Sequence, residues 1–133
     1  MLNKILFIDD DPITFMLFKK VIEKAGFAKK IDVAKNGTEA VNYFKEFIAN
    51  EKLTELPNLI FLDLNMPVMG GWEFLDQFSS IDFAEKFSSL KVIVLSSTID
   101  PYDIDKAKKY PMVLDFLSKP ITVEMLNYIE TIM

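Results

Sequence analysis

Five short apolar runs alternate along the chain with longer segments in which apolar residues recur at helical spacing. The runs predict strands at Lys4–Ile8, Lys30–Ala34, Leu59–Leu62, Lys91–Leu95 and Val113–Leu117. Three of them contain the uninterrupted apolar stretches ILFI, LIFL and VIVL, which are typical of strands buried on both faces. The second run alternates between apolar and polar residues, so we expect it at an edge. Strands that alternate with helices predict a parallel sheet covered by helices.

The intervening segments predict five helices. The first has an apolar face around Phe18 and Ile22 and ends near Gly26. The second begins near Gly37 and is followed by a polar stretch that Pro57 closes. We expect the second helix to bury Ala40, Val41, Phe44, Phe47 and Ile48. The third helix follows Gly71, and Trp72 at its start is interpreted mainly as a packing residue.

The fourth helix opens with Asp100 as N-cap and Pro101 in the first turn, which together form a strong start signal. Its apolar content is low, which predicts a weakly anchored, exposed helix. Packing and an exposed contact surface are equally good interpretations of its apolar residues, namely Tyr102, Ile104, Ala107 and Tyr110. The fifth helix runs from Thr122, with Met125, Ile129 and Ile132 on one side. The segment Asp76–Leu90 is long for one helix and a connection, and we expect Phe78, Phe83 and Phe87 to cover the core.

Composition narrows the classes of function. With 133 residues, half of them apolar, the chain fits one domain, which we expect to span residues 1–133 without an effector domain. It has no cysteine and no histidine, which excludes disulfides, the usual zinc sites and Ser/His/Asp catalysis. The net charge of −5 argues against nucleic-acid binding. Apolar stretches are too short for a signal peptide or a membrane span, so we expect a cytoplasmic protein that binds no membrane.

Polar residues with useful chemistry follow four of the predicted strands. Asp9 and Asp10 follow the first, Asp63 the third, Ser96 the fourth and Lys119 the fifth. Taken singly, each has an ordinary explanation as a turn former, a helix cap or a solvated loop residue. Because the carboxyl ends of parallel strands meet at one edge of a sheet, their joint occurrence favours a common site.

Three clustered carboxylates with one lysine lack sufficient positive charge. Two carboxylates about 4 Å apart repel each other by about 4 kcal/mol at an effective dielectric near 20. A divalent cation offsets this repulsion, and a purely oxygen ligand set favours Mg²⁺ or Mn²⁺ over zinc. A metal flanked by a lysine and a hydroxyl suits phosphoryl oxygens, because these groups offset the charge that develops during transfer.

The motifs KILFIDDDP, LIFLDLNMPVMGGWEFL, VIVLSS and FLSKPI follow one another in an order and spacing that resembles the receiver domain of bacterial two-component response regulators. The resemblance covers essentially the whole chain. It implies an α/β, flavodoxin-like, doubly wound fold, with a five-stranded parallel sheet in the order 2-1-3-4-5 and helices on both faces. It also implies that Asp63 accepts a phosphoryl group from a histidine kinase or a histidine phosphotransfer protein. Such a protein signals to a partner rather than acting as an enzyme, although it takes part in its own phosphorylation and dephosphorylation.

The resemblance assigns a metal site residue by residue. Asp9, Asp10, Asp63 and the backbone carbonyl of Asn65 hold Mg²⁺, with Mn²⁺ as an alternative. Asp10 is the more direct ligand, and Asp9 acts mainly through water. A departure from the family is Gly70, which stands where an aspartate is common and implies a weaker cap for the third helix.

The same resemblance assigns the groups that respond to the phosphoryl group. Lys119 pairs with the acceptor carboxylate and later with the phosphoryl oxygens, and its bond to Pro120 is expected to be cis. Ser96 donates its hydroxyl to the phosphoryl group, and Phe116 is the aromatic residue that swings inward. Ser96 and Phe116 thus form the expected switch.

Several alternatives stay open. A haloacid-dehalogenase-like phosphatase uses similar groups, but its nucleophile is the first aspartate of a DxD motif after the first strand, whereas here a DxN motif follows the third. A receiver-like binding module that is never phosphorylated is a second rival. The role of a receiver itself is also open between a phosphorelay intermediate, a phosphate sink and a diffusible regulator, either monomeric or a phosphorylation-dependent dimer. The target is unknown, and the face formed by the fourth helix, the fifth strand and the fifth helix is one candidate for its binding.

Overall fold

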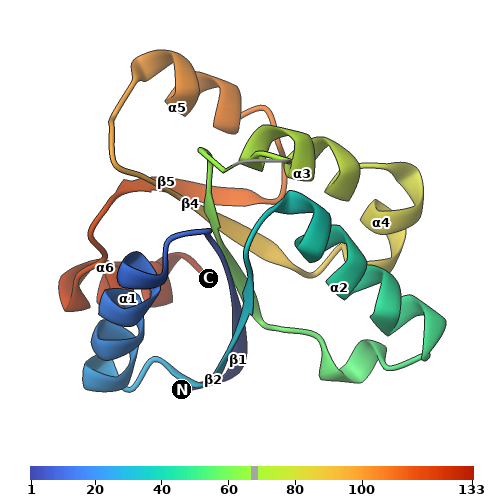
Figure 1. The fold of residues 1–133 in the computed structure, drawn as a ribbon, viewed down its shortest axis with the longest axis horizontal. Coiled ribbons are helices and arrows are strands. Elements are labelled where there is room, and N and C mark those ends of the chain that lie inside the picture. The colour runs from blue at the N-terminus through green and yellow to red at the C-terminus, as the bar shows by residue number, and fades with distance from the viewer. Residues whose placement is uncertain (67–68) are drawn as a thin grey trace.

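A parallel sheet in the order β2-β1-β3-β4-β5 forms the centre of the molecule in a computed structural model that describes residues 1–66 and 69–133. Within these residues the sheet has five strands, and helices cover both of its faces (Figure 1). The strands are β1 (Leu2–Ile8), β2 (Ala28–Ala34), β3 (Leu59–Asp63), β4 (Lys91–Ser96) and β5 (Val113–Ser118). The predicted flavodoxin-like fold and strand order are confirmed. Pro67 and Val68, within the longest motif, lie outside the described residues.

The helices divide between the two faces of the sheet. On one face lie α1 (Pro12–Ala25) and α6 (Val123–Ile132), and on the other lie α2 (Gly37–Ala49), α3 (Gly71–Phe78) and α4 (Ile81–Lys86). A 3-10 turn, η1 (Leu53–Glu55), precedes β3, and α5 (Pro101–Ala107) connects β4 to β5. The segment Asp76–Leu90, which is long for one helix and a connection, contains an additional helix, because α3 ends at Phe78 and Ser80 then begins α4 as its N-cap. The prediction of five helices omitted α4, so the predicted fourth and fifth helices are α5 and α6. Phe78, Phe83 and Phe87 are buried as predicted.

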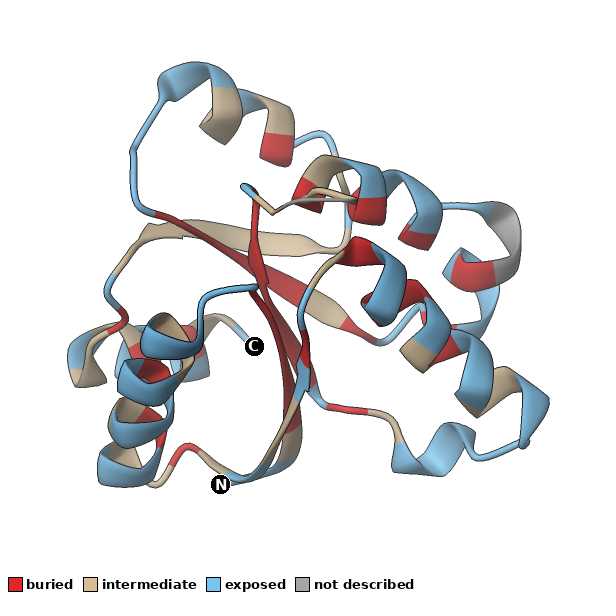
Figure 2. Ribbon diagram, in the orientation of Figure 1, coloured by how far each residue is buried: buried red, intermediate tan, exposed pale blue. Residues whose placement is uncertain are grey.

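The sheet separates two hydrophobic cores. Alternate residues of the central strands point to opposite faces, so that Leu6 and Ile60 pack towards α2 and α3, whereas Ile5 and Phe61 pack towards α1 and α6. This two-sided burial explains the uninterrupted apolar runs of β1, β3 and β4, which are largely buried in Figure 2. The prediction that the second strand lies at an edge is also confirmed.

The helices bury fewer of the expected residues at their margins. In α2, Ala40, Val41 and Phe44 are buried, but Phe47 and Ile48 are only partly so. Phe47 lies at the edge of the core, where its ring approaches Tyr43 and the ammonium of Lys4. In α6, Ile129 is buried as expected, whereas Met125 and Ile132 are half-buried. Leu126, which the expected pattern omitted, is fully buried in α6.

The helix α5 is weakly anchored, as predicted. The Asp100 side chain accepts a hydrogen bond from the backbone N–H of Tyr102 and so caps the helix. Among the residues of α5, all of which the structure describes, Ala107 alone is buried (Figure 2). Tyr102 is 70% exposed, whereas Tyr110 packs against the core. Packing therefore accounts for Ala107 and Tyr110, and exposure for Tyr102.

Candidate functional site

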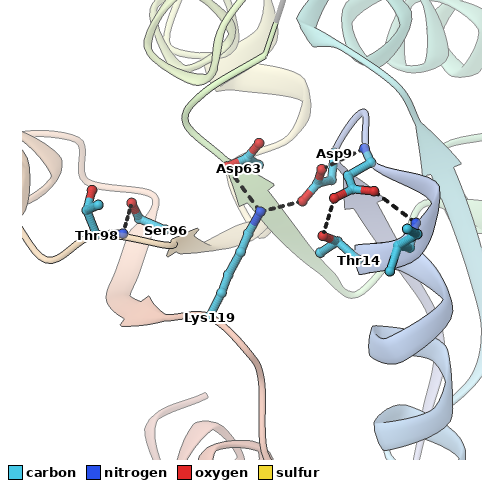
Figure 3. Close-up of polar contacts among 8 residues, drawn as sticks. Asp9, Thr14, Asp63, Ser96, Thr98 and Lys119 are labelled. Carbon is cyan, nitrogen blue, oxygen red and sulfur yellow. Dashed lines mark hydrogen bonds and ion pairs between the residues drawn. The ribbon is translucent and has the colours of Figure 1, made fainter.

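The predicted strand-end residues meet at one edge of the sheet, where Figure 3 shows Asp9, Asp63, Ser96 and Lys119. Asp10 belongs to the same acidic cluster. Asp63 ends β3 and is paired in register with Leu95, one residue before Ser96 at the end of β4. Lys119 follows β5 directly, and its backbone N–H donates to the carbonyl of Ser96 over 2.8 Å. The parallel topology therefore brings together groups that lie up to 110 residues apart in the chain.

The Lys119 ammonium contacts both buried carboxylates of the site. Its Nζ lies 2.6 Å from Oδ2 of Asp9 and 3.3 Å from Oδ1 of Asp63. The Lys119 side chain itself is largely buried, with 17% of its surface exposed. The Lys119–Pro120 peptide bond is cis, as predicted. One ammonium group therefore bridges two buried carboxylates.

The carboxylates form a candidate site for a divalent cation. One oxygen each of Asp9, Asp10 and Asp63 lies within 4.8 Å of the others. Asp9 and Asp63 are buried, whereas Asp10 is exposed, so the cluster is open to solvent on one side. Three oxygen donors and an open side fit a hard cation that retains several water ligands.

The start of α1 orients the acidic pair. The backbone N–H of Asp11 donates to Oδ1 of Asp9 over 3.0 Å. Asp11 in turn caps α1, accepting hydrogen bonds from the backbone N–H of Ile13 and the hydroxyl of Thr14. These two hydrogen bonds lower the pKa of Asp11. Asp9 and Asp11 are thus held by the helix start, while Asp10 between them faces solvent.

The electrostatics of the site disfavour an isolated Asp63 anion. Burial raises the pKa of the Asp63 carboxyl, and the charge of Asp9 adds to this effect, although the Lys119 ammonium and the backbone N–H of Asn65 oppose it. Burial by itself lowers the pKa of Lys119, but the hydrogen bond to Asp9 and the charge of Asp63 outweigh it, so the pKa is raised. Lys119 therefore stays charged, and Asp63 retains an unfavourable charge that further positive charge would relieve.

The remaining predicted residues lie close to this centre. Asn65 is exposed two residues after Asp63, and the metal contact of its carbonyl stays a prediction. Ser96 is buried, and its Oγ accepts a hydrogen bond from the backbone N–H of Thr98 over 3.3 Å. Phe116 is half-buried on β5, opposite Val94 of β4. Its role as a switch with Ser96 also stays a prediction.

Gly70 occupies the N-cap of α3 and has no side chain with which to cap it, in line with the expected weaker cap. The more important feature of this turn is close packing. A Cβ atom at Gly71 would lie 2.7 Å from the carbonyl oxygen of Asp63, so only glycine allows α3 to begin this close to the end of β3.

Sequence reasoning missed an apolar surface beside the site. Ile13, Met16 and Leu17 of α1 are 65%, 50% and 50% exposed. Of these three residues, Leu17 lines a groove of about 630 Å³ that reaches Lys119 and Pro120. The first two turns of this helix contain more apolar residues than one buried face requires, and this feature of the sequence could have predicted the exposed apolar surface.

Comparison with known proteins gives consistent matches. The model of the response regulator receiver domain family matches residues 5–129. The chemotaxis protein CheY of Thermotoga maritima is 30% identical over 132 residues, which cover 96% of this chain and 98% of that protein. The probable methanogenesis regulatory protein FilR2 of Methanothrix harundinacea is 29% identical over 92% of this chain and 76% of its own length. The crystal structure of a two-component response regulator from Cytophaga hutchinsonii superposes with a TM-score of 0.86 at 32% identity, covering 98% of this chain and 95% of that one. The chain therefore belongs to the response regulator receiver domain family.

Proposed function

We propose that this receiver domain accepts a phosphoryl group on Asp63 from a phosphohistidine donor in a Mg²⁺-dependent reaction and thereby changes its affinity for a protein partner. The observation that carries the proposal is the ammonium of Lys119, which bridges the buried carboxylates of Asp9 and Asp63 beside the exposed Asp10. Receiver domains are signalling proteins rather than conventional enzymes, and this arrangement has the groups needed to receive a phosphoryl group.

The transfer exchanges one bond to phosphorus for another. A carboxylate oxygen of Asp63 forms a bond to phosphorus as the bond from phosphorus to the donor imidazole nitrogen breaks, and the released imidazole takes up a proton from solvent. Lys119 lies 3.3 Å from Asp63 and is placed to contact the oxygens of the transferred group. The donor is a separate protein or domain, since this chain contains no histidine.

The acidic cluster supports the proposed metal dependence. Asp9, Asp10 and Asp63, with the backbone carbonyl of Asn65, would hold Mg²⁺, and Mn²⁺ would serve as an alternative. The cation supplies positive charge that offsets the negative charge on the phosphoryl oxygens. The raised pKa of Asp63 supports this assignment, because an ionised carboxylate that burial disfavours is one that a neighbouring cation stabilises.

Ser96 and Phe116 would convert phosphorylation into a change of shape. The Ser96 oxygen accepts from Thr98, which leaves its hydroxyl hydrogen able to turn towards a phosphoryl oxygen on Asp63. Movement of Ser96 then makes room for the ring of Phe116, which is half-buried on the neighbouring strand. The face formed by α5, β5 and α6 is the proposed surface on which the target reads this change.

The apolar surface of α1 is the proposed docking site of the phosphodonor. Leu17 lines the groove that reaches Lys119, and Ile13 and Met16 are exposed on the same helix, so a donor seated on Leu17 is close to the acceptor site. We expect Leu17→Ser to lower the ratio of the transfer rate from a phosphohistidine protein to the rate from acetyl phosphate. An unchanged ratio would place the donor elsewhere.

The proposal also covers the location and the oligomeric state of the protein. We place the protein in the cytoplasm and propose that it does not bind nucleic acid. The described residues contain no helix long and apolar enough to cross a bilayer, and the net charge is −5. Monomer and phosphorylation-dependent dimer stay as alternatives, to be separated by the molar mass in solution before and after phosphorylation.

The decisive experiment is the intact mass of the protein after incubation with acetyl phosphate and Mg²⁺. We expect one phosphoryl adduct on the native chain, and none on Asp63→Asn or after addition of EDTA. Asp105→Asn makes the same change at an exposed residue of α5 and is expected to retain the adduct. A folded, Mg²⁺-binding protein that acquires no adduct from acetyl phosphate or from phosphohistidine proteins would refute the proposal. Turnover of a free phosphomonoester would instead favour a phosphatase.

A further inference from the structure

Two residues of α3, one residue of α5 and one just beyond α5 form a set of contacts that we call the aromatic clamp: Trp72, Asp76, Lys106 and Tyr110. The rings of Trp72 and Tyr110 are stacked, with centroids 6.1 Å apart and planes inclined by 24°. The ammonium of Lys106 lies 4.5 Å from the centre of the Trp72 ring. The hydroxyl of Tyr110 donates to Oδ1 of Asp76 over 2.5 Å. Three different interactions therefore join the same two segments.

The spacing of the clamp residues makes these contacts mutually consistent. Trp72 and Asp76 are four residues apart on α3, so they lie on the same face of that helix. Lys106 and Tyr110 are also four residues apart, at the end of α5 and just beyond it. Burial and the carboxylate of Asp76 raise the pKa of Tyr110 to about 12, so its hydroxyl remains a hydrogen-bond donor at neutral pH. Figure 1 shows α5 standing next to α3 at the edge of the molecule.

The clamp matters because α5 has few other anchors. Within this fully described helix only Ala107 is buried. Ser96 ends β4, and the loop that follows it leads to Asp100, the N-cap of α5. The proposed switch residue therefore precedes the start of α5, and the clamp lies at the other end of the helix. Because only a few residues separate Ser96 from α5, movement of Ser96 would shift the start of the helix, and the contacts of Tyr110 would oppose this displacement.

We propose that the aromatic clamp holds α5 in its resting position and opens when phosphorylation of Asp63 displaces the helix, so that the clamp sets the threshold of the switch. The idea rests on the proposed function, because it concerns the response to a phosphoryl group on Asp63. A ring stack, a cation over a ring and a hydrogen bond each typically change an equilibrium by about two- to tenfold. Acting on one short helix, they bias its position measurably towards the resting state.

Hydrogen exchange in the unphosphorylated protein tests the restraint without any phosphodonor. Tyr110→Phe removes the hydroxyl that binds Asp76 but keeps the ring, and we expect the amides of residues 101–107 to exchange about three- to tenfold faster. The matched control is Tyr128→Phe, because the hydroxyl of Tyr128 likewise donates to a carboxylate, that of Asp115, away from the clamp. Exchange of these amides that is equal in the native protein and Tyr110→Phe would overturn the restraint.

Fluorescence of Trp72, the single tryptophan of the chain, tests the opening. We expect its emission to change on phosphorylation by acetyl phosphate and Mg²⁺, and to stay constant in Asp63→Asn. In Lys106→Met the cation is absent, so the emission before phosphorylation should already lie closer to that of the phosphorylated native protein.

The two proposals fail in different ways. A phosphoryl adduct in the mass spectrum with unchanged Trp72 emission would overturn the opening of the clamp and leave the proposed function standing. The absence of any adduct would overturn the proposed function and, with it, the coupling of the clamp to phosphorylation. The exchange experiment reports on the restraint of α5 in either case.

Discussion

Replacing Asp63 by asparagine is expected to stabilise the metal-free protein, even though it removes a partner of Lys119. At 3.3 Å, the attraction between Lys119 and Asp63 is about 5 kcal/mol at an effective dielectric of 20, and the repulsion from Asp9, whose carboxylate lies within 4.8 Å, is at least about 3.5 kcal/mol. These terms alone leave at most about 1.5 kcal/mol in favour of the charged Asp63. Burying a carboxylate costs several kcal/mol, however, and burial is the largest influence on the raised pKa of Asp63.

The net sign follows from that pKa. Because the pKa of Asp63 in the folded state lies above its ordinary value of 3.8, the ionised carboxylate opposes folding. Because burial costs several kcal/mol and the Coulomb terms return at most about 1.5 kcal/mol, we expect Asp63→Asn to raise the free energy of unfolding at neutral pH by at least about 1 kcal/mol, which corresponds to at least about 3 °C in Tm for a domain of this size. Lys119 retains Asp9 as a partner in the variant, so no buried ammonium is left unpaired.

The assay is urea unfolding in EDTA at pH 7, with Asp105→Asn as the control for loss of an exposed carboxylate. The difference between native protein and Asp63→Asn should shrink as the pH falls through the folded-state pKa towards 3.8, because both states then carry a protonated Asp63. Saturating Mg²⁺ should stabilise the native protein more than the variant. A loss of more than about 1 kcal/mol in EDTA would mean that the attraction to Lys119 outweighs burial, and would refute the reasoning.

Three further substitutions test the charge of the site and the packing of the domain. Lys119→Met leaves two buried carboxylates without their ammonium, so the free energy of unfolding in urea with EDTA should fall by about 2–4 kcal/mol. The rate of phosphorylation by acetyl phosphate should fall at least about tenfold, and equal rates would contradict the role of the lysine. Phe44→Ala removes a fully buried ring and should cost about 3–5 kcal/mol in urea unfolding. Gly37→Ala would place Cβ 2.6 Å from the Cγ of Met69, and we expect thermal unfolding to show a decrease of about 1–3 kcal/mol in the free energy of unfolding. For Gly70→Ala, where the atom nearest to Cβ lies at 3.3 Å, we expect a decrease of less than about 1 kcal/mol.

Local patterns in the chain determined most of the fold and the membership of the site. The apolar runs of β1, β3 and β4 are readable because a strand buried on both faces has no polar alternation. Asp63, Ser96 and Lys119 were found because the residue after a parallel strand lies at the same edge of the sheet as its neighbours. The cap of α5 at Asp100 was likewise a signal contained in two adjacent residues.

Tertiary structure alone decided which carboxylates are buried, which helix faces are covered and how α5 is restrained. The hydrophobic pattern does not show which of Asp9 and Asp10 is buried, but in the structure Asp9 is buried and Asp10 is exposed. The stack of Trp72 on Tyr110 joins two segments that lie far apart in the chain. Periodicity reports the environment of a residue relative to its own helix or strand, whereas these contacts depend on side-chain packing between residues far apart in the chain.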